Sequence, residues 1–309
     1  MSIIAIEDIS HVRFRAPDLV QMRTFLEDFG LNVADDGDRL FAHGKGQAPV
    51  CHITEKGEAA FLALGLRASS VADLEKLAAA EGVEVTDFDA PVGGQVVRLV
   101  DPNGYGIEVV AGQELRPVAD SAAAPSFNSG YDHPRLGRAP LVAPSPAEVV
   151  RLGHAVLEVS DFRESEGWYK ERFGFLTSDE IEFMPGAAIG AFMRCNRGDM
   201  PTDHHTLFLM QAQGEPKFNH AAFEVAGLDA MMTGHDHLAA KGYDAWWGIG
   251  RHILGNQIFD YWRDPWGHTL EHWTDGDLLT AADPPAQATV MDLLSVQWGP
   301  PMQMPGQGG

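Results

Sequence analysis

The sequence predicts an α+β protein made of two tandem copies of one architecture. Two observations predict this: a strand–helix pattern that occurs twice, and a strand–turn–strand pattern that follows each of the two. The 309 residues, 45% of them hydrophobic, are enough for two domains that each have a core.

The strand–helix pattern occupies residues 9–30 and 152–174. Each copy is an alternating strand with a central His, an Asp seven residues later, and an amphipathic helix that ends at Phe-Gly. Second helices are predicted over residues 70–81 and 229–241, because a Gly again follows the last periodic residue.

The strand–turn–strand pattern occupies residues 97–110 and 259–273. In both copies Asp-Pro-x-Gly forms the turn, and a Glu follows the Gly by four residues, at Glu108 and Glu271. Alternation places Glu271 among large apolar side chains, where a charge is costly unless something pairs with it. Glu271 is therefore expected to have a partner.

These repeats divide the chain into predicted domains. Residues 1–115 form the first domain, and residues 150–280 form the second. Between them, residues 116–149 are rich in Ala, Pro, Ser and Gly and are predicted to be a surface linker. The tail, residues 281–309, is either disordered or an arm that packs on the body.

The net charge of −22 argues against nucleic acid or an anionic membrane as a partner, because both need a basic surface. The two cysteines exclude a disulfide framework and a Cys-based zinc site. No secretory signal pattern and no apolar run of about 20 residues occurs. The sequence predicts a soluble, cytoplasmic protein.

Histidines cluster in the second copy, where His154 and His220 lie in two strand-like runs and Glu271 lies in a third. Inward-pointing side chains from three strands of one sheet can meet at a point. Two imidazoles and one carboxylate form the facial triad that binds Fe(II) and leaves coordination positions open. A divalent cation would then be the partner of Glu271.

The first copy keeps only part of this constellation. His11 and Glu108 persist, but the position that matches His220 falls near Leu62. The first copy is therefore expected to bind no metal, with His11 as a structural residue.

A resemblance to a known family rests on residues of one segment: His252, Tyr261, Asp264-Pro265, Gly267 and Glu271. This set resembles the ring-cleavage signature of type I extradiol catechol dioxygenases of the vicinal oxygen chelate (glyoxalase-like) superfamily, which includes biphenyl-diol and catechol 2,3-dioxygenases. The resemblance implies four βαβββ modules, two in each domain, and one metal site in the C-terminal half. Asp260 departs from the signature, which prefers an apolar residue there, and is expected to point away from the metal onto the outer sheet face.

The family resemblance also implies the chemistry. Its members insert both atoms of O₂ into a catechol-type diol at non-haem Fe(II), with Mn(II) also possible, in the catabolism of aromatic compounds, and they assemble as homo-oligomers. The metal ligands would be His154, His220 and Glu271.

The resemblance further assigns roles around the metal. His205 would supply a proton as a catalytic acid. His252 and Tyr261 would bind the substrate and assist catalysis, and Phe192 is the best candidate for a substrate pocket.

Roles outside metal binding and catalysis are expected for several other residues. His204 is expected to be a surface-loop residue, and His235 and His237 should face solvent. Residues 243–255, rich in Gly with two Trp, suit a loop over the site. Arg251 is the only Arg near the expected site, which favours a neutral catechol.

Other functions stay open at this point. A hydroxyphenylpyruvate-type dioxygenase uses a similar triad but would not need His205, His252 and Tyr261. A glyoxalase-like isomerase would take metal ligands from two modules, with an extra Glu replacing one His. A non-catalytic ligand-binding member of the superfamily would typically have lost the metal ligands.

Overall fold

The computed structural model describes residues 2–117, 127–139 and 141–302. The helices are α1 (Leu19–Phe29), α2 (Val71–Glu81), α3 (Phe162–Phe173), α4 (Leu228–Lys241) and α5 (Val290–Leu294). The first sheet contains, in spatial order, β2 (Asn32–Asp35), β3 (Arg39–His43), β4 (His52–Lys56), β1 (Ile6–Ala16), β5 (Ala60–Ala68), β8 (Gly106–Ala111), β7 (Gln95–Val100) and β6 (Val85–Asp87).

The second sheet has the same plan with two extra edge strands. Its spatial order is β19 (Ala286–Thr289), β10 (Leu176–Met184), β11 (Ala187–Arg194), β13 (Leu207–Gln211), β9 (Val149–Val159), β14 (Lys217–Val225), β17 (Thr269–Thr274), β16 (Ile258–Arg263), β15 (Asp244–His252) and β20 (Val296–Trp298). A short ladder joins β12 (Thr202–Asp203) to β18 (Leu278–Leu279).

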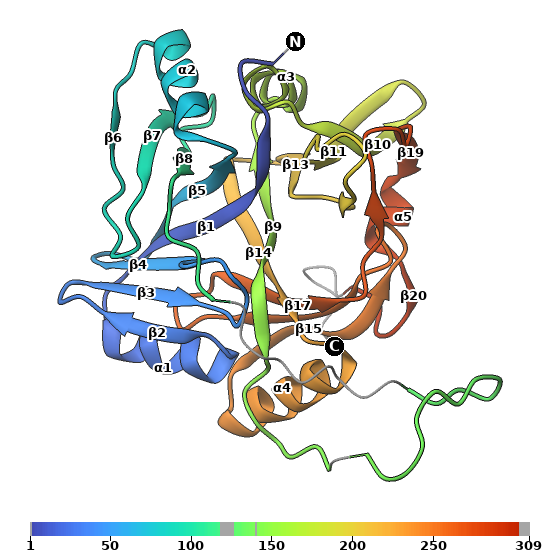
Figure 1. Cartoon of the computed structure of the whole chain (residues 1–309). Coiled ribbons are helices and arrows are strands. Elements are labelled where there is room, and N and C mark those ends of the chain that lie inside the picture. Colours follow the sequence, from blue (N-terminus) through green and yellow to red (C-terminus); the bar gives the residue numbers. More distant parts are fainter. Residues whose placement is uncertain (1, 118–126, 140, 303–309) are drawn as a thin grey trace.

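The expected α+β fold of four βαβββ modules is confirmed (Figure 1). In each sheet the first strands of two modules pair antiparallel at the centre, β1 with β5 and β9 with β14. The two halves lie side by side in Figure 1, with the N-terminal sheet in blue to blue-green and the C-terminal sheet in light green through yellow to red.

Local chemistry explains where the helices begin and end. The side chains of Asp18 and Asp161 accept backbone N–H groups at the starts of α1 and α3. These are the Asp residues that follow each central His by seven positions. Gly30 and Gly174 end the same helices with positive φ angles of 110° and 72°, a conformation that Gly adopts without strain.

Both halves contribute to one continuous apolar core, although two separate cores were expected. Phe14 of β1 meets Phe218 of β14 edge-on at 5.2 Å between ring centroids. His272 of β17 points away from Glu271, stacks on Phe29 at 3.9 Å and hydrogen-bonds its carbonyl oxygen at 2.8 Å. The halves are therefore fixed against each other by buried contacts.

The C-terminal segment is a packed arm over its described part. β19 extends one edge of the second sheet by pairing parallel with β10, and β20 extends the other by pairing antiparallel with β15. Residues 303–309 of the expected tail lie outside the described residues. No helix in the described part of the chain is long and apolar enough to cross a membrane.

Candidate active site

Three neighbouring strands place His154, His220 and Glu271 together, on β9, β14 and β17. The strand register sets Ala222 directly opposite both His154 and Glu271. His220 precedes Ala222 by two residues and therefore lies on the same face of the sheet. Because Ala222 has only a methyl group, the three longer side chains can converge above it.

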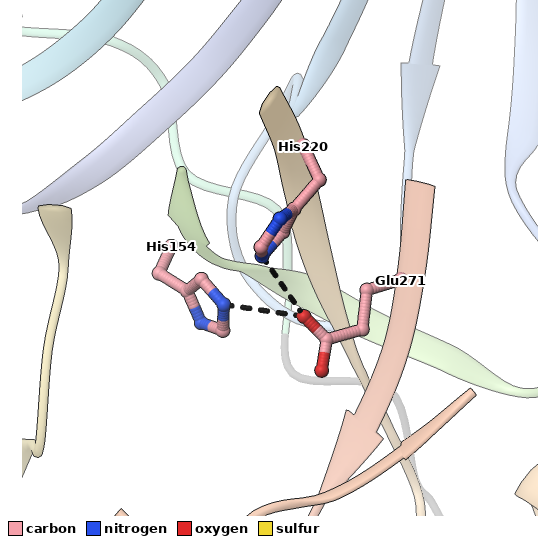
Figure 2. A group of neighbouring side chains, drawn as sticks. All are labelled: His154, His220 and Glu271. Carbon is pink, nitrogen blue, oxygen red and sulfur yellow. Dashed lines mark ion pairs between the residues drawn. The ribbon is translucent and has the colours of Figure 1, made fainter. Parts of the chain in front are cut away.

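The convergence is close, as Figure 2 shows. Nε2 of His154 and Nε2 of His220 each lie 3.3 Å from Oε2 of Glu271. One ligand atom from each residue falls within 4.8 Å of the other two. Separations of 3.3 Å exceed the roughly 2.7–2.9 Å of charge-assisted hydrogen bonds. They suit atoms that share one divalent ion at roughly 2.1 Å.

The three side chains also fit a metal because the buried carboxylate among them lacks hydrogen-bond partners. Glu271 is fully buried, and neither of its carboxylate oxygens has a well-formed hydrogen bond within the described chain. Burial alone would raise the pKa of Glu271, but the His154 and His220 nitrogens hold that pKa well below its usual range. Burial likewise lowers the pKa of His154, so its ring is neutral and can ligate.

A residue that sequence reasoning missed orients His220. Its Nδ1–H donates to Oδ1 of Asn219 at 2.8 Å, which leaves Nε2 with a free lone pair toward Glu271. Asn219 in turn donates to Glu158 at 2.9 Å. The position of Asn219 beside a predicted ligand was the one sequence signal that could have revealed this support.

A cavity of about 280 Å³ opens beside this group. His154, Phe192, His205, His220, His252 and Tyr261 all line it, so the sequence-predicted residues meet around one space. Apolar side chains form most of the remaining wall: Val156, Phe208, Met210, Trp246, Trp247, Ile253, Leu254, Leu293, Leu294 and Met302.

His205 and Phe192 lie on one side of the cavity. The His205 ring packs on that of His154 at 3.9 Å between centroids, and burial holds the pKa of His205 well below its usual range. Phe192 meets His205 edge-on at 4.8 Å and stacks on Phe208 at 4.0 Å.

His252 and Tyr261 lie on the other side. Tyr261 stands directly opposite Glu271 in the ladder between β16 and β17, and its hydroxyl is 3.0 Å from Nε2 of His252. Burial and the nearby Glu271 charge raise the pKa of Tyr261 well above its usual range. The phenol is therefore protonated and available as a hydrogen-bond donor.

In the first copy the corresponding carboxylate is neutralised by protein cations. Glu108 accepts hydrogen bonds from Arg13 Nη2 at 3.0 Å and Arg98 Nε at 2.9 Å, and it lies 2.7 Å from His11. Burial would raise the pKa of Glu108, but His11 and Arg13 lower it to about 2. Among the described residues no metal-ligand cluster forms there.

The strand register corrects one position in the first copy. Gly65 stands opposite Glu108 as Ala222 stands opposite Glu271. The residue that matches His220 is therefore Ala63, two positions before Gly65, and not Leu62. A shift of one residue matters because neighbouring strand residues face opposite sides.

Three histidines expected at the surface make hydrogen bonds within the fold, and the side chains of His235 and His237 stay partly exposed, at 30% and 18%. His204 is 4% exposed, so it is no surface-loop residue. His235 hydrogen-bonds Asp260 beneath α4 at 3.1 Å, and His237 hydrogen-bonds Asp28 at 2.8 Å. Asp260 does point away from Glu271, yet it is fully buried rather than on an outer face.

Two further expectations change at the cavity rim. The segment expected to be a loop over the site is mostly strand β15, with Trp246 and Trp247 on the cavity wall. Arg251 binds Asp275 at 2.5 Å and does not line the cavity.

Comparison with known proteins finds similarity to one family model and to a curated relative. Residues 151–272 match the model of the Glyoxalase/Bleomycin resistance protein/Dioxygenase superfamily. A curated relative, metapyrocatechase 2 of Cupriavidus necator, is 28% identical over 300 residues, which cover 96% of this chain and 90% of the relative.

Solved structures share the fold across almost the whole chain. The Mn(II)-bound glyoxalase from Novosphingobium aromaticivorans has a TM-score of 0.80 at 22% identity, covering 96% of this chain and 93% of its own. The 2,3-dioxygenase LapB from Pseudomonas sp. KL28 has a TM-score of 0.76 at 20% identity, covering 93% of this chain and 99% of its own. Residues 151–272 are therefore similar to the Glyoxalase/Bleomycin resistance protein/Dioxygenase superfamily, and the whole chain has a two-sheet fold shared with a 2,3-dioxygenase.

Proposed function

We propose that the protein is an extradiol ring-cleaving dioxygenase, which inserts both atoms of O₂ into a catechol-type diol. The observation that carries this proposal is the convergence of His154, His220 and Glu271 at the wall of an apolar cavity. The name of the curated relative, a metapyrocatechase, supports the same reaction class.

The proposed metal is Fe(II), held by His154, His220 and Glu271. Bound there, it would supply a site for the diol and dioxygen and carry electrons between them. A site of two nitrogens and one oxygen also accepts Mn(II). The chain's own contribution is to position the substrate, exclude water and move protons.

The proton steps fall to the two flanking groups. Tyr261, whose phenol is protonated, donates a hydrogen bond to an oxygen of the substrate. His252 accepts the proton of that substrate hydroxyl. His205, on the opposite side beside His154, takes the proton of the second substrate hydroxyl and returns it as the ring opens. A histidine then lies on each side of the bound substrate ring and can exchange a proton with it.

The wall of the cavity indicates a neutral, apolar-substituted catechol. Among the described lining residues, Lys217 is the only Lys or Arg, and it is paired with Glu158 at 3.6 Å. Asp292 adds a second acid. A carboxylate on the substrate would meet this acidic rim, whereas an alkyl or aryl group would contact Phe208 and Leu293.

The test combines metal content with product. Protein purified without oxygen and given Fe(II) should hold about one iron per chain and turn catechols yellow through ring-opened products. Among matched substrates, 3- or 4-alkyl and aryl catechols should exceed catechol carboxylates in kcat/KM.

Three outcomes would contradict the proposal. Turnover of a 4-hydroxyphenylpyruvate or a thiol hemiacetal in place of catechols would assign a different reaction. Tight catechol binding without turnover by the iron-loaded protein would leave a ligand-binding protein.

A further inference from the structure

His204 is held in a chain of hydrogen bonds that leads to the candidate active site. Its Nε2 lies 2.7 Å from Oδ2 of Asp179 on β10, and its Nδ1 lies 3.1 Å from Nδ1 of His205. Ser178 also donates to its carbonyl oxygen at 2.5 Å, and the turn at Gly255 covers its ring. The Asp179 side chain is 14% exposed, so this series of hydrogen bonds reaches from near the solvent to the cavity.

This arrangement determines which nitrogens carry protons. The Asp179 carboxylate accepts a hydrogen bond from Nε2–H of His204. Nδ1 of His204 then accepts a hydrogen bond from Nδ1–H of His205. His205 is left with a bare Nε2, the nitrogen that can take a proton in the cavity.

We propose that Asp179 and His204 are positioning residues that fix the ring orientation and the tautomer of His205. This inference rests on the proposed function only for its kinetic test.

The kinetic test uses Asp179→Asn. It should lower kcat about 10- to 100-fold, within the range for acid–base catalysis, with KM and iron content within about 2-fold of wild type. His204→Phe keeps a ring of similar shape and should lower kcat by a similar factor.

A double-mutant cycle separates this role from a structural one. In a His205→Gln background, Asp179→Asn should cause no further loss, because it acts through His205. Asp28→Asn is the matched control, because Asp28 also accepts a hydrogen bond from a histidine, His237, but does not line the cavity. The kcat of the Asp28→Asn variant should be unchanged. Equal losses with and without His205 would overturn the proposal, as would an unchanged kcat in Asp179→Asn.

A second readout needs no turnover. In ¹⁵N-histidine NMR spectra of the full-length protein with diamagnetic Zn(II), His205 should carry its proton on Nδ1 and His204 on Nε2. Signals are assigned by their loss in His205→Gln and His204→Phe. A proton on Nε2 of His205 and none on Nδ1 would overturn the proposal. If no catechol is turned over, the proposed function fails while this measurement still tests the tautomer.

Discussion

Glu108 and Glu271 occupy matching positions in the two copies but have different neighbours, and therefore different roles. Glu108 is surrounded by Arg13, Arg98 and His11, whereas Glu271 faces the imidazole nitrogens of His154 and His220 and no Arg or Lys among the described residues. The first carboxylate already has its counter-charges, and the second still requires one. At the residue scale, the neighbouring side chains decide which copy can bind a metal.

This difference predicts opposite results for the two glutamates. Glu271→Ala and His220→Ala should weaken metal binding at least about 100-fold, because each removes a ligand. Glu108→Ala should leave about one metal per folded chain. It should instead lower the free energy of unfolding by about 3–5 kcal/mol, since Arg13 loses a buried partner. Metal analysis and urea denaturation measure both, and equal metal loss in all three would contradict a single site.

His205→Phe should retain iron and substrate affinity and slow ring opening by about 100-fold or more. The phenyl ring can keep the contact with Phe192 but has no proton to give. Anaerobic substrate titration followed by rapid mixing with oxygen distinguishes binding from ring opening. A wild-type rate in this variant would return His205 to a packing role.

At the scale of elements, the C-terminal arm contributes to the cavity wall in addition to the sheet. Leu293 and Leu294 of α5 line it, although the arm matches no part of the repeated pattern. β19 and β20 hold α5 in place by extending opposite edges of the sheet.

The arm therefore predicts a change in substrate recognition. Leu293→Ala should raise KM for an apolar-substituted catechol about tenfold through lost contact, with iron content unchanged. Met291→Ala on the same helix is the control, because Met291 is 69% exposed and does not line the cavity. Steady-state kinetics of both variants tests this, and equal KM values would exclude α5 from the substrate site.

At the scale of the whole molecule, the two halves meet through buried aromatic rings. His52 stacks on Phe14 at 5.0 Å, and Phe14 also contacts Phe218 and His268 of the other half. Burial lowers the pKa of His52 to about 3. The folded protein thus holds this ring neutral where the unfolded chain would protonate it.

The sign of the pH dependence follows. His52 contributes stability that is complete above about pH 6.5, the pKa of an unfolded His. That stability is lost as pH falls toward its folded pKa of about 3, at up to about 1.4 kcal/mol per pH unit. His52→Phe should reduce the slope of unfolding free energy between pH 6.5 and 4, measured by urea denaturation. The exposed His133→Phe should leave that slope unchanged, and equal slopes in all three proteins would contradict the assignment.

The sequence by itself determined the repeat, the module order and the identity of the converging residues. Periodicity locates strands and helices, and the Asp-Pro-x-Gly turns set the phase that puts Glu271 on an inward face. These are local properties, which neighbouring residues along the chain fix. The homo-oligomer expected from the family resemblance stays a prediction, to be measured by the native mass.

Only the tertiary structure decided which polar residues have partners. His204 and Asp179 are 25 residues apart, Arg13 and Glu108 are 95 apart, and the arm reaches the cavity from beyond both repeats. Such contacts depend on strand order and register, which place residues distant in the sequence side by side. The local sequence pattern around each residue gives no sign of these contacts. The same reason explains why β15 is a strand where the sequence predicts a loop: its Gly residues suggest flexibility, but pairing with β16 and β20 on both sides holds it extended.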